Sequence, residues 1–211
     1  SEITGAYADR AFWGDYTVDF WDHFDVPPGG YPASLPAPLG HGAVPSDVLG
    51  RYRNLIWVGN NYHGDLGSWL GTPILSYLQA GGNALLLTRQ GDQFLTDSLR
   101  SYLGINFVSG TTLYDCIATR PGLTNVARLG TQSLCPVFDT VRTRSDSQLL
   151  YKVDQNYTPD RGIGVFRRPT GGGTDRPSGA RFIFLSGRPY RWDHAQLRTN
   201  VMTMLLEYFE E

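Results

Sequence analysis

Charged residues are sparse in this sequence, and neither sign dominates. Lys and Arg number 18 against 20 Asp and Glu among 211 residues, which gives a formal net charge of −2. Domains that bind DNA or RNA typically carry a basic face or stripe, so this balance argues against nucleic-acid partners. The chain also lacks any run approaching 18 consecutive apolar residues, and we therefore expect no membrane-spanning helix.

Cysteine is scarce as well, with only Cys116 and Cys135 present. Both lie in a stretch with weak periodicity and many turn residues, where a cross-link would order a long excursion. We expect a disulfide between them, which would constrain the unfolded chain by about 3 kcal/mol; two buried free thiols are the alternative. Because disulfides persist in oxidising compartments, the pair predicts a secreted protein, extracellular or at the cell surface.

The common catalytic motifs are missing. The sequence has no G-x-S-x-G elbow, and no G-x-G-x-x-G or Walker loop follows a predicted strand, so we expect no nucleotide cofactor. His63 and Asp65 follow a predicted strand and would suit a metal site or an acid–base pair. The other histidines, His23, His41 and His194, show no ligand spacing, and zinc needs three or four convergent ligands, so we expect no metal.

The length and periodicity predict one α/β domain over residues 1–211. A chain of this length buries roughly 70% of the surface that its unfolded form exposes, enough for a core of its own. Continuous apolar runs bounded by turn residues indicate buried strands, and capped, helix-periodic segments lie between them. The expected strands cover 54–59, 84–88, 162–167 and 181–186, and the expected helices cover 72–82, 94–103 and 193–208. Tyr16 to Trp21 alternates as a further strand does.

These elements predict a three-layer α/β/α architecture with a mostly parallel, flavodoxin-like sheet. Residues 111–159 interrupt the pattern with short strand-like pieces, which we interpret as an irregular, β-rich insertion. The final helix carries the clearest start signal, because Asp193 and Gln196 have the spacing of a capping box.

The order of elements resembles the class I glutamine amidotransferase-like fold over roughly residues 16–209. The likeness is carried by the phrase L-x-x-Y-x-x-[LV]-I-W at Leu49 to Trp57, by the helix ending Ala80 to Gly82, and by the ending Leu185 to Pro189. It is closest to the non-catalytic versions of that domain in large secreted bacterial proteins. The near-helical spacing of aromatic residues between Tyr7 and Tyr16 predicts a short amphipathic helix at the start of the sequence. Domains of this family begin with a central strand, and only Ser1 to Gly5 precede that helix here, so we expect the strand to be absent, supplied by another segment or lost to cleavage.

The resemblance implies a site that has lost its catalytic residues. Arg89 stands where the cysteine nucleophile of active members would stand, Arg188 replaces their histidine, and Tyr190 replaces the acid. Nucleophilic catalysis needs a nucleophile beside an oriented base. We therefore expect a protein that is not an enzyme of this type.

Both arginines would lie at strand carboxyl ends, where open α/β sheets bind ligands. Two guanidinium groups there would suit a carboxylate, phosphate or sulfate, unless each simply pairs with a neighbouring aspartate. Trp192, near the same expected cleft, is a candidate contact for a sugar.

The sequence thus predicts a non-catalytic structural or interaction domain of an exported multidomain or assembled protein, whose partners are other domains or subunits. The alternatives are a module that binds an anionic or carbohydrate ligand through Arg89, Arg188 and Trp192, and a hydrolase whose catalytic residues the sequence does not reveal, with His63 and Asp65 as one candidate pair. A structural domain should have a filled cleft, and a ligand-binding module should have an open polar one.

Overall fold

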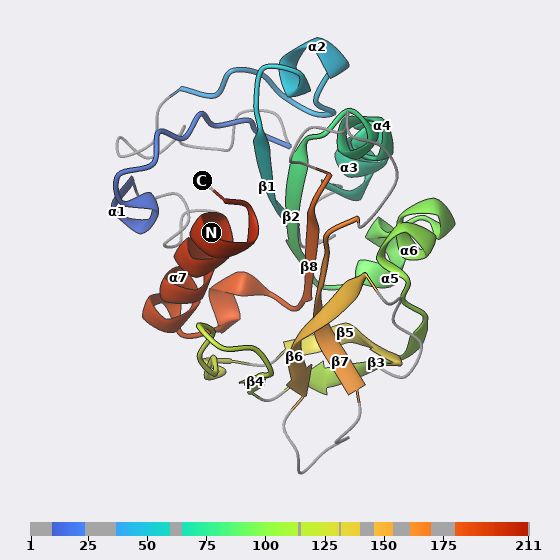
Figure 1. Cartoon of the computed structure of the whole chain (residues 1–211), viewed down its shortest axis with the longest axis vertical. Coiled ribbons are helices and arrows are strands. Elements are labelled where there is room, and N and C mark those ends of the chain that lie inside the picture. Colours follow the sequence, from blue (N-terminus) through green and yellow to red (C-terminus); the bar gives the residue numbers. More distant parts are fainter. Residues whose placement is uncertain are drawn as a thin grey trace.

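A single eight-stranded sheet runs through the centre of the protein. The computed structural model describes residues 10–23, 37–59, 65–113, 115–130, 132–139, 146–153, 161–169 and 180–210. Helix α7 covers one face of the sheet, and helices α3, α4 and α6 cover the other (Figure 1). The predicted arrangement of helices on both faces of an α/β sheet is therefore present.

Most of the helices precede or follow the strands of the first half of the chain, and the second half is rich in strands. The helices are α1 (Arg10–Trp13), α2 (Ser46–Leu49), α3 (Asp65–Gly71), α4 (Ile74–Gln79), α5 (Gly91–Phe94), α6 (Asp97–Leu103) and α7 (His194–Thr203). The strands are β1 (Asn54–Gly59), β2 (Asn83–Thr88), β3 (Phe107–Leu113), β4 (Cys116–Ala118), β5 (Gln132–Asp139), β6 (Ser147–Val153), β7 (Arg161–Arg167) and β8 (Phe182–Ser186). A 3₁₀ turn, η4 (Pro189–Arg191), precedes α7, and a π-helical turn, η5 (Met204–Tyr208), extends it.

Strands β1, β2 and β8 form the parallel part of the sheet. Asn54 pairs with Asn83 at the start of β1 and β2, and Thr88 pairs with Ser186 at the end of β2 and β8. Successive side chains of a strand point to opposite faces. A continuous apolar run such as Leu85, Leu86 and Leu87 therefore feeds both cores, with Leu85 and Leu87 on the α7 side and Leu86 on the α4 side.

The other five strand pairs are antiparallel, so the expectation of a mostly parallel sheet is wrong. The strand order is β1-β2-β8-β7-β5-β3, with β6 beside β7 and β4 beside β6. Most of the additional strands come from the predicted insertion. Strand β3 pairs with β5 and β4 with β6, and both β5 and β6 pair with β7, so these strands extend the sheet in antiparallel pairs.

Strand β5 occupies the space beyond the carboxyl end of β8. Both strands pair with β7, β8 along Gly164–Arg167 and β5 at Arg161 and Gly162, while β6 pairs with β7 over Gly162–Arg167. Strand β7 has two edges. Strand β6 pairs along one of them, and β8 and β5 pair one after the other along the second. Gly162 permits this approach, because a Cβ there would lie 2.2 Å from the ring of Phe138 in β5.

The sequence predicts several helix ends correctly, but one of its predicted strands is absent. Asp193 caps α7 by accepting from the Gln196 amide at 2.9 Å, and Gly104 ends α6 in the left-handed conformation with φ +70°. Residues 16–21 do not form the predicted strand. Instead the segment reaches the β1 side, where Tyr16 packs against the core on the α7 side and Trp21 against the core on the α4 side.

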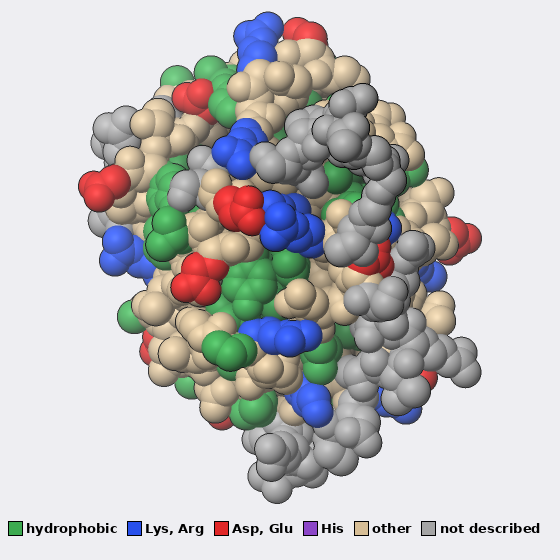
Figure 2. Space-filling model, viewed as in Figure 1, with side chains coloured by type: hydrophobic (Ala, Val, Ile, Leu, Met, Phe, Trp, Pro, Cys, Tyr) green, Lys and Arg blue, Asp and Glu red, His purple; other side chains and the backbone are tan. Residues whose placement is uncertain are grey.

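Charged groups are mixed on the surface. On the face seen in Figure 2, basic and acidic side chains alternate around hydrophobic ones, with no extended field of one sign. No described helix is long and apolar enough to cross a membrane.

Candidate functional site

The carboxyl ends of β2 and β8 bring the two predicted arginines to one edge of the sheet. Thr88 and Ser186 are Cα partners in these parallel strands, and the Gly187 amide donates to the Thr88 carbonyl at 2.9 Å. Arg89 follows the first strand directly, and Arg188 follows the second after Gly187. Arg188 is buried, with 9% of its surface exposed, whereas Arg89 is half-buried.

Strand β5 crosses this edge and covers it. The Gln90 amide donates to the Leu134 carbonyl at 2.8 Å, and the Ser186 hydroxyl donates to the Pro136 carbonyl at 2.6 Å. Cys135, between these two contacts, is 0% exposed. The place where an open α/β sheet receives a ligand is thus occupied by the chain's own backbone.

The positive charges of the two arginines act on the pKa of the Cys135 thiol. Burial raises the pKa of Cys135 to about 12, and the positive charges of Arg188 and Arg89 act in the opposite direction. Burial also raises the pKa of Cys116, with smaller contributions in the same direction from Cys135 and Asp115. A thiol in this state is protonated at neutral pH, and the thiolate is the nucleophilic form. The geometry therefore gives Cys135 a packing role rather than a reactive one.

The predicted disulfide is not formed. Cys116 and Cys135 are both buried free thiols, which was the alternative that the sequence left open. Cys116 lies in β4 and pairs with Val153 and Val126, so it belongs to the core on the α7 side without a cross-link.

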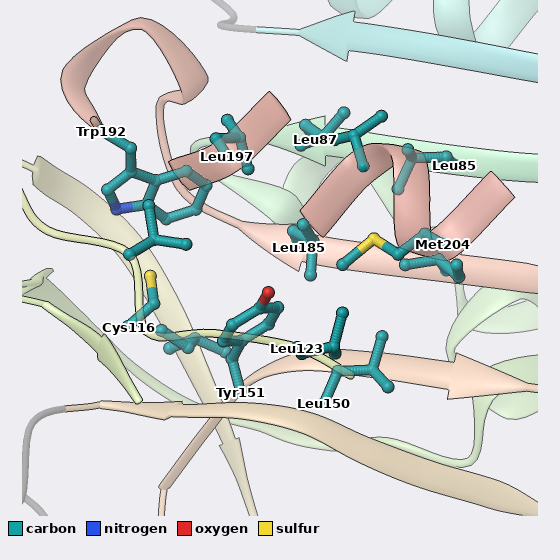
Figure 3. Packing of buried hydrophobic residues seen from close by; sticks show 14 of the residues in the cluster. Leu85, Leu87, Cys116, Leu123, Leu150, Tyr151, Leu185, Trp192, Leu197 and Met204 are labelled. Carbon is teal, nitrogen blue, oxygen red and sulfur yellow. The ribbon is translucent and has the colours of Figure 1, made fainter. Parts of the chain in front are cut away.

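Trp192 is a core residue, which corrects its interpretation as a ligand contact. It is 2% exposed and lies against Gly187, where a Cβ would come within 2.3 Å of the indole. Figure 3 shows Trp192 with Cys116, Tyr151, Leu185 and Leu197. These residues line a cavity of about 10 Å³, which has room for about one water molecule. A sugar has no access to the indole there.

The second predicted pair, His63 and Asp65, is described at only one of its two positions. Asp65 begins α3 just after the carboxyl end of β1 and is 2% exposed. His63 lies outside the described residues, so the pair remains a prediction. Among the described residues no group of three or more His, Cys, Asp and Glu side chains is arranged to hold a metal.

Sequence reasoning missed the residues that define the closed edge. Gln90, one position after Arg89, takes the left-handed conformation at the strand-to-helix turn with φ 52°, and Leu134 does the same in β5 with φ 59°. Non-glycine residues rarely adopt this conformation, and neither Gln nor Leu indicates it in a sequence. Cys135 was noticed only as half of an expected disulfide.

A shallow groove lies elsewhere, on the helical layer. It has a volume of about 150 Å³ and is lined by residues of α3 and α4 together with Thr96 and Leu99. Trp69 forms part of its floor and is 1% exposed, with its indole N–H donating to the Phe94 carbonyl at 2.6 Å. Neither this groove nor the small cavity includes Arg89 or Arg188.

Comparison with known proteins identifies the fold and no more. No protein-family model and no curated protein matches the sequence. Among solved structures the chain is similar to one described as "mmIFT52 N-terminal domain", with a TM-score of 0.50 and 10% identity over 82% of this chain and 84% of that chain. This chain shares the fold of that domain.

Two expectations from the sequence are corrected by this match. The resemblance to amidotransferase-like domains is wrong, because the similar structure is an IFT52 N-terminal domain and the eight-stranded sheet is mixed. The expectation of a secreted protein is also wrong. It rested on a disulfide that is not formed and on a likeness to secreted domains that the structural match does not repeat.

Proposed function

We propose that this chain is a non-catalytic structural and interaction domain that assembles with other subunits of a larger complex. The observation that carries this proposal is the closure of the carboxyl edge by β5. Ligand sites in open α/β sheets lie in the crevice at this edge, and here Cys135 fills it at 0% exposure. When a domain fills its ligand crevice with its own side chains, its outer surface is the part that can still bind other molecules.

The similar solved structure is consistent with this proposal. Its description names it an N-terminal domain, and therefore a part of a longer protein. The surface of the present domain also carries several exposed leucines, among them Leu129 and Leu134, that contribute little to its own core.

The proposal is tested by isolating the full chain at its natural level with a small affinity tag and measuring its mass by native mass spectrometry. We expect one or more other polypeptides in fixed stoichiometry with the 23.4 kDa chain. A chain that is monomeric at every concentration in such extracts would contradict it.

A second candidate function is the binding of a small anion between Arg89 and Arg188, because both arginines follow the paired carboxyl ends of β2 and β8. The rate at which the Cys135 thiol is alkylated distinguishes an open anion site from an edge that β5 closes. With β5 in place, Cys135 should resist iodoacetamide at pH 8 until the protein unfolds. Rapid alkylation of Cys135 in the folded protein, slowed by phosphate or sulfate, would favour the anion site instead.

A further inference from the structure

Three arginines lie at the amino ends of the parallel strands, on the edge of the sheet opposite the closed one. Arg53 precedes β1, Arg181 precedes β8, and Arg168 follows β7. The Asn83 amide at the start of β2 donates to the Arg53 carbonyl at 2.8 Å, and the Ala84 amide donates to the Arg181 carbonyl at 2.9 Å. These bonds place Arg53 and Arg181 on either side of β2.

Arg168 reaches the same edge because β7 and β8 are antiparallel. Arg167 at the end of β7 pairs with Phe182 at the start of β8. Partners in an antiparallel pair run in opposite directions along the chain. The residues that come next at this edge are therefore Arg168 and Arg181, side by side.

The carboxylate of Glu210 lies between these two arginines. Its Oε1 is 3.1 Å from Nη1 of Arg168, and its Oε2 is 2.7 Å from Nη2 of Arg181. The hydrogen bond from Arg181 lowers the pKa of Glu210, desolvation opposes this, and the charges of all three arginines, Arg53 included, lower the pKa further. The chain thus shows an oxyanion seated on this group of arginines.

The site is fixed on its inner side and open to solvent on its outer side. The Arg181 side chain is 1% exposed, and its Nη1 donates to the Tyr208 carbonyl at 3.1 Å. The side chains of Arg168 and Glu210 are 57% and 46% exposed. A donor that is already held in place loses less entropy when it binds a ligand, and the exposed side gives a ligand access.

Glu210 does not match the charge of this site. One carboxylate faces three guanidinium groups, and the nearby described acids have other contacts. Asp146 pairs with Arg167 at 2.9 Å, and a Cβ at Gly122 would lie 3.0 Å from the Glu207 carboxylate. The arginines and Glu210 together therefore carry a formal charge of about +2 among the described residues.

Two further features indicate that Glu210 is an imperfect occupant. The Nε of Arg181 is buried and has no hydrogen-bond partner among the described residues, although a buried donor without an acceptor is costly. Glu210 itself has a left-handed backbone with φ 57°. Strained conformations of this kind are concentrated at ligand clamps and switch regions.

We propose that Arg53, Arg168 and Arg181 form a binding site for a phosphate group, and that Glu210 is a built-in competitor for it. A phosphate group carries between one and two negative charges at neutral pH and has more acceptor oxygens than a carboxylate. Guanidinium groups bind phosphate bidentately. Phosphate therefore matches three arginines better than one glutamate does. This inference goes beyond the proposed function and does not depend on it.

The binding test is isothermal titration calorimetry of the full chain with inorganic phosphate, with chloride added to hold the ionic strength constant. Glu210→Gln removes the competing charge and keeps the size of the side chain. A double variant, Glu210→Gln with Arg168→Gln, also removes the exposed arginine of the site. The control variant is Asp97→Asn, because Asp97 is an exposed carboxylate that lies 3.7 Å from Arg100 in a different ion pair.

We expect Glu210→Gln to bind phosphate at least tenfold more tightly than the natural chain, and the double variant to bind at least tenfold more weakly than Glu210→Gln. Asp97→Asn should bind within twofold of the natural chain. Equal gains in Glu210→Gln and Asp97→Asn, or unchanged binding in the double variant, would overturn the proposal. If Glu210→Gln melts at a lower temperature than the natural chain, phosphate and not chloride should restore its melting temperature, and failure to do so would also overturn it.

A second ligand, the peptide acetyl-Gly-phosphoserine-Gly-amide, distinguishes the two sources of a phosphate group. If Glu210→Gln binds this peptide at least tenfold more tightly than inorganic phosphate, the site takes a phosphorylated segment of a protein. A smaller difference, or weaker binding of the peptide, assigns the site to a small phosphate ligand. If Glu210→Gln binds neither, the phosphate site is wrong, and the proposed function is still decided by native mass spectrometry.

Discussion

The parallel and antiparallel parts of the sheet are built on different principles. In β1, β2 and β8 the strands are in continuous register, their apolar side chains feed cores on both faces, and helices cover them. In β3 to β7 the pairing contains register shifts and includes the left-handed Leu134. The first part supplies regular packing, whereas the second carries the irregular backbone that closes the carboxyl edge.

This difference indicates a division of roles within one sheet. Parallel strands buried on both faces tolerate little variation, and every residue of β2 and β8 is buried. Bulged antiparallel strands can present side chains to solvent and approach the ends of other strands. The antiparallel part accordingly carries an exposed leucine on its bulge, Leu134, which is 53% exposed.

Matched core deletions test this division most strongly. Leu86 in β2 and Leu150 in β6 are both 0% exposed. We expect Leu86→Ala to lower the free energy of unfolding by about 3–5 kcal/mol and Leu150→Ala by about 2–3 kcal/mol, because a site that can partly collapse loses less. Urea unfolding with a common m-value gives both numbers. An equal or larger loss at Leu150 would mean that the two parts are equally well packed.

Acidification should lower the free energy of unfolding through His23, which packs against β1 at the edge of the parallel part. His23 stacks on Trp57 of β1 with ring centroids 4.1 Å apart, and burial lowers its pKa to about 4 from 6.5, against the opposing charge of Asp22. Because the unfolded chain binds the proton more readily, this contribution is fully present above pH 6.5 and is lost as pH falls towards 4. The loss is about 3 kcal/mol over that window.

Unfolding measured at several pH values in the natural chain and in His23→Gln checks this expectation. The substitution should flatten the stability profile between pH 4 and 6.5. An unchanged slope in His23→Gln would assign the pH dependence to other groups.

One hydrogen bond joins the parallel part to the antiparallel part, from the Ser186 hydroxyl in β8 to the Pro136 carbonyl in β5, and we expect its loss to have a smaller effect. Removing the Ser186 hydroxyl leaves the buried Pro136 carbonyl without its 2.6 Å donor. We expect Ser186→Ala to cost about 1–2 kcal/mol and to speed amide exchange in β5 more than in β2. Thr119→Ala is a suitable control, because its hydroxyl donates to the Leu149 carbonyl at 2.6 Å within the antiparallel part. Uniformly faster exchange in Ser186→Ala would contradict a local link.

The parallel part was predictable from the sequence because its signals are local. Continuous apolar runs located β1, β2 and β8 to within a residue or two, and Asp193 and Gly104 marked helix ends correctly. The capping box at α7 formed only in one direction, since the Gln196 side chain accepts instead from the Ala127 amide at 2.7 Å. That interaction joins residues 69 positions apart, and no local pattern contains it.

The candidate site was predictable only in part, because some of its features depend on contacts between residues far apart in the sequence. The equivalence of the β2 and β8 carboxyl ends placed Arg89 and Arg188 at one edge, because parallel register can be inferred from strand order. The crossing of β5 depends on Gly162 and on a bulge at Leu134, which are determined by packing between distant segments. The cysteines illustrate the limit, since their spacing suggested a cross-link and their environment instead makes them core residues.

The smallest expected effect concerns the strained residue itself. A left-handed conformation costs a non-glycine residue roughly 1–2 kcal/mol, and glycine adopts it without this penalty but loses more entropy on folding. We therefore expect Leu134→Gly to raise the free energy of unfolding by about 0.5–1 kcal/mol, because the 53% exposed side chain contributes little packing. Leu129→Gly, at an equally exposed position without positive φ, should lower it instead. Urea unfolding of the two variants decides the question. A loss of stability in Leu134→Gly would show that the leucine side chain stabilises the antiparallel part, and the left-handed backbone would then be a consequence of its packing.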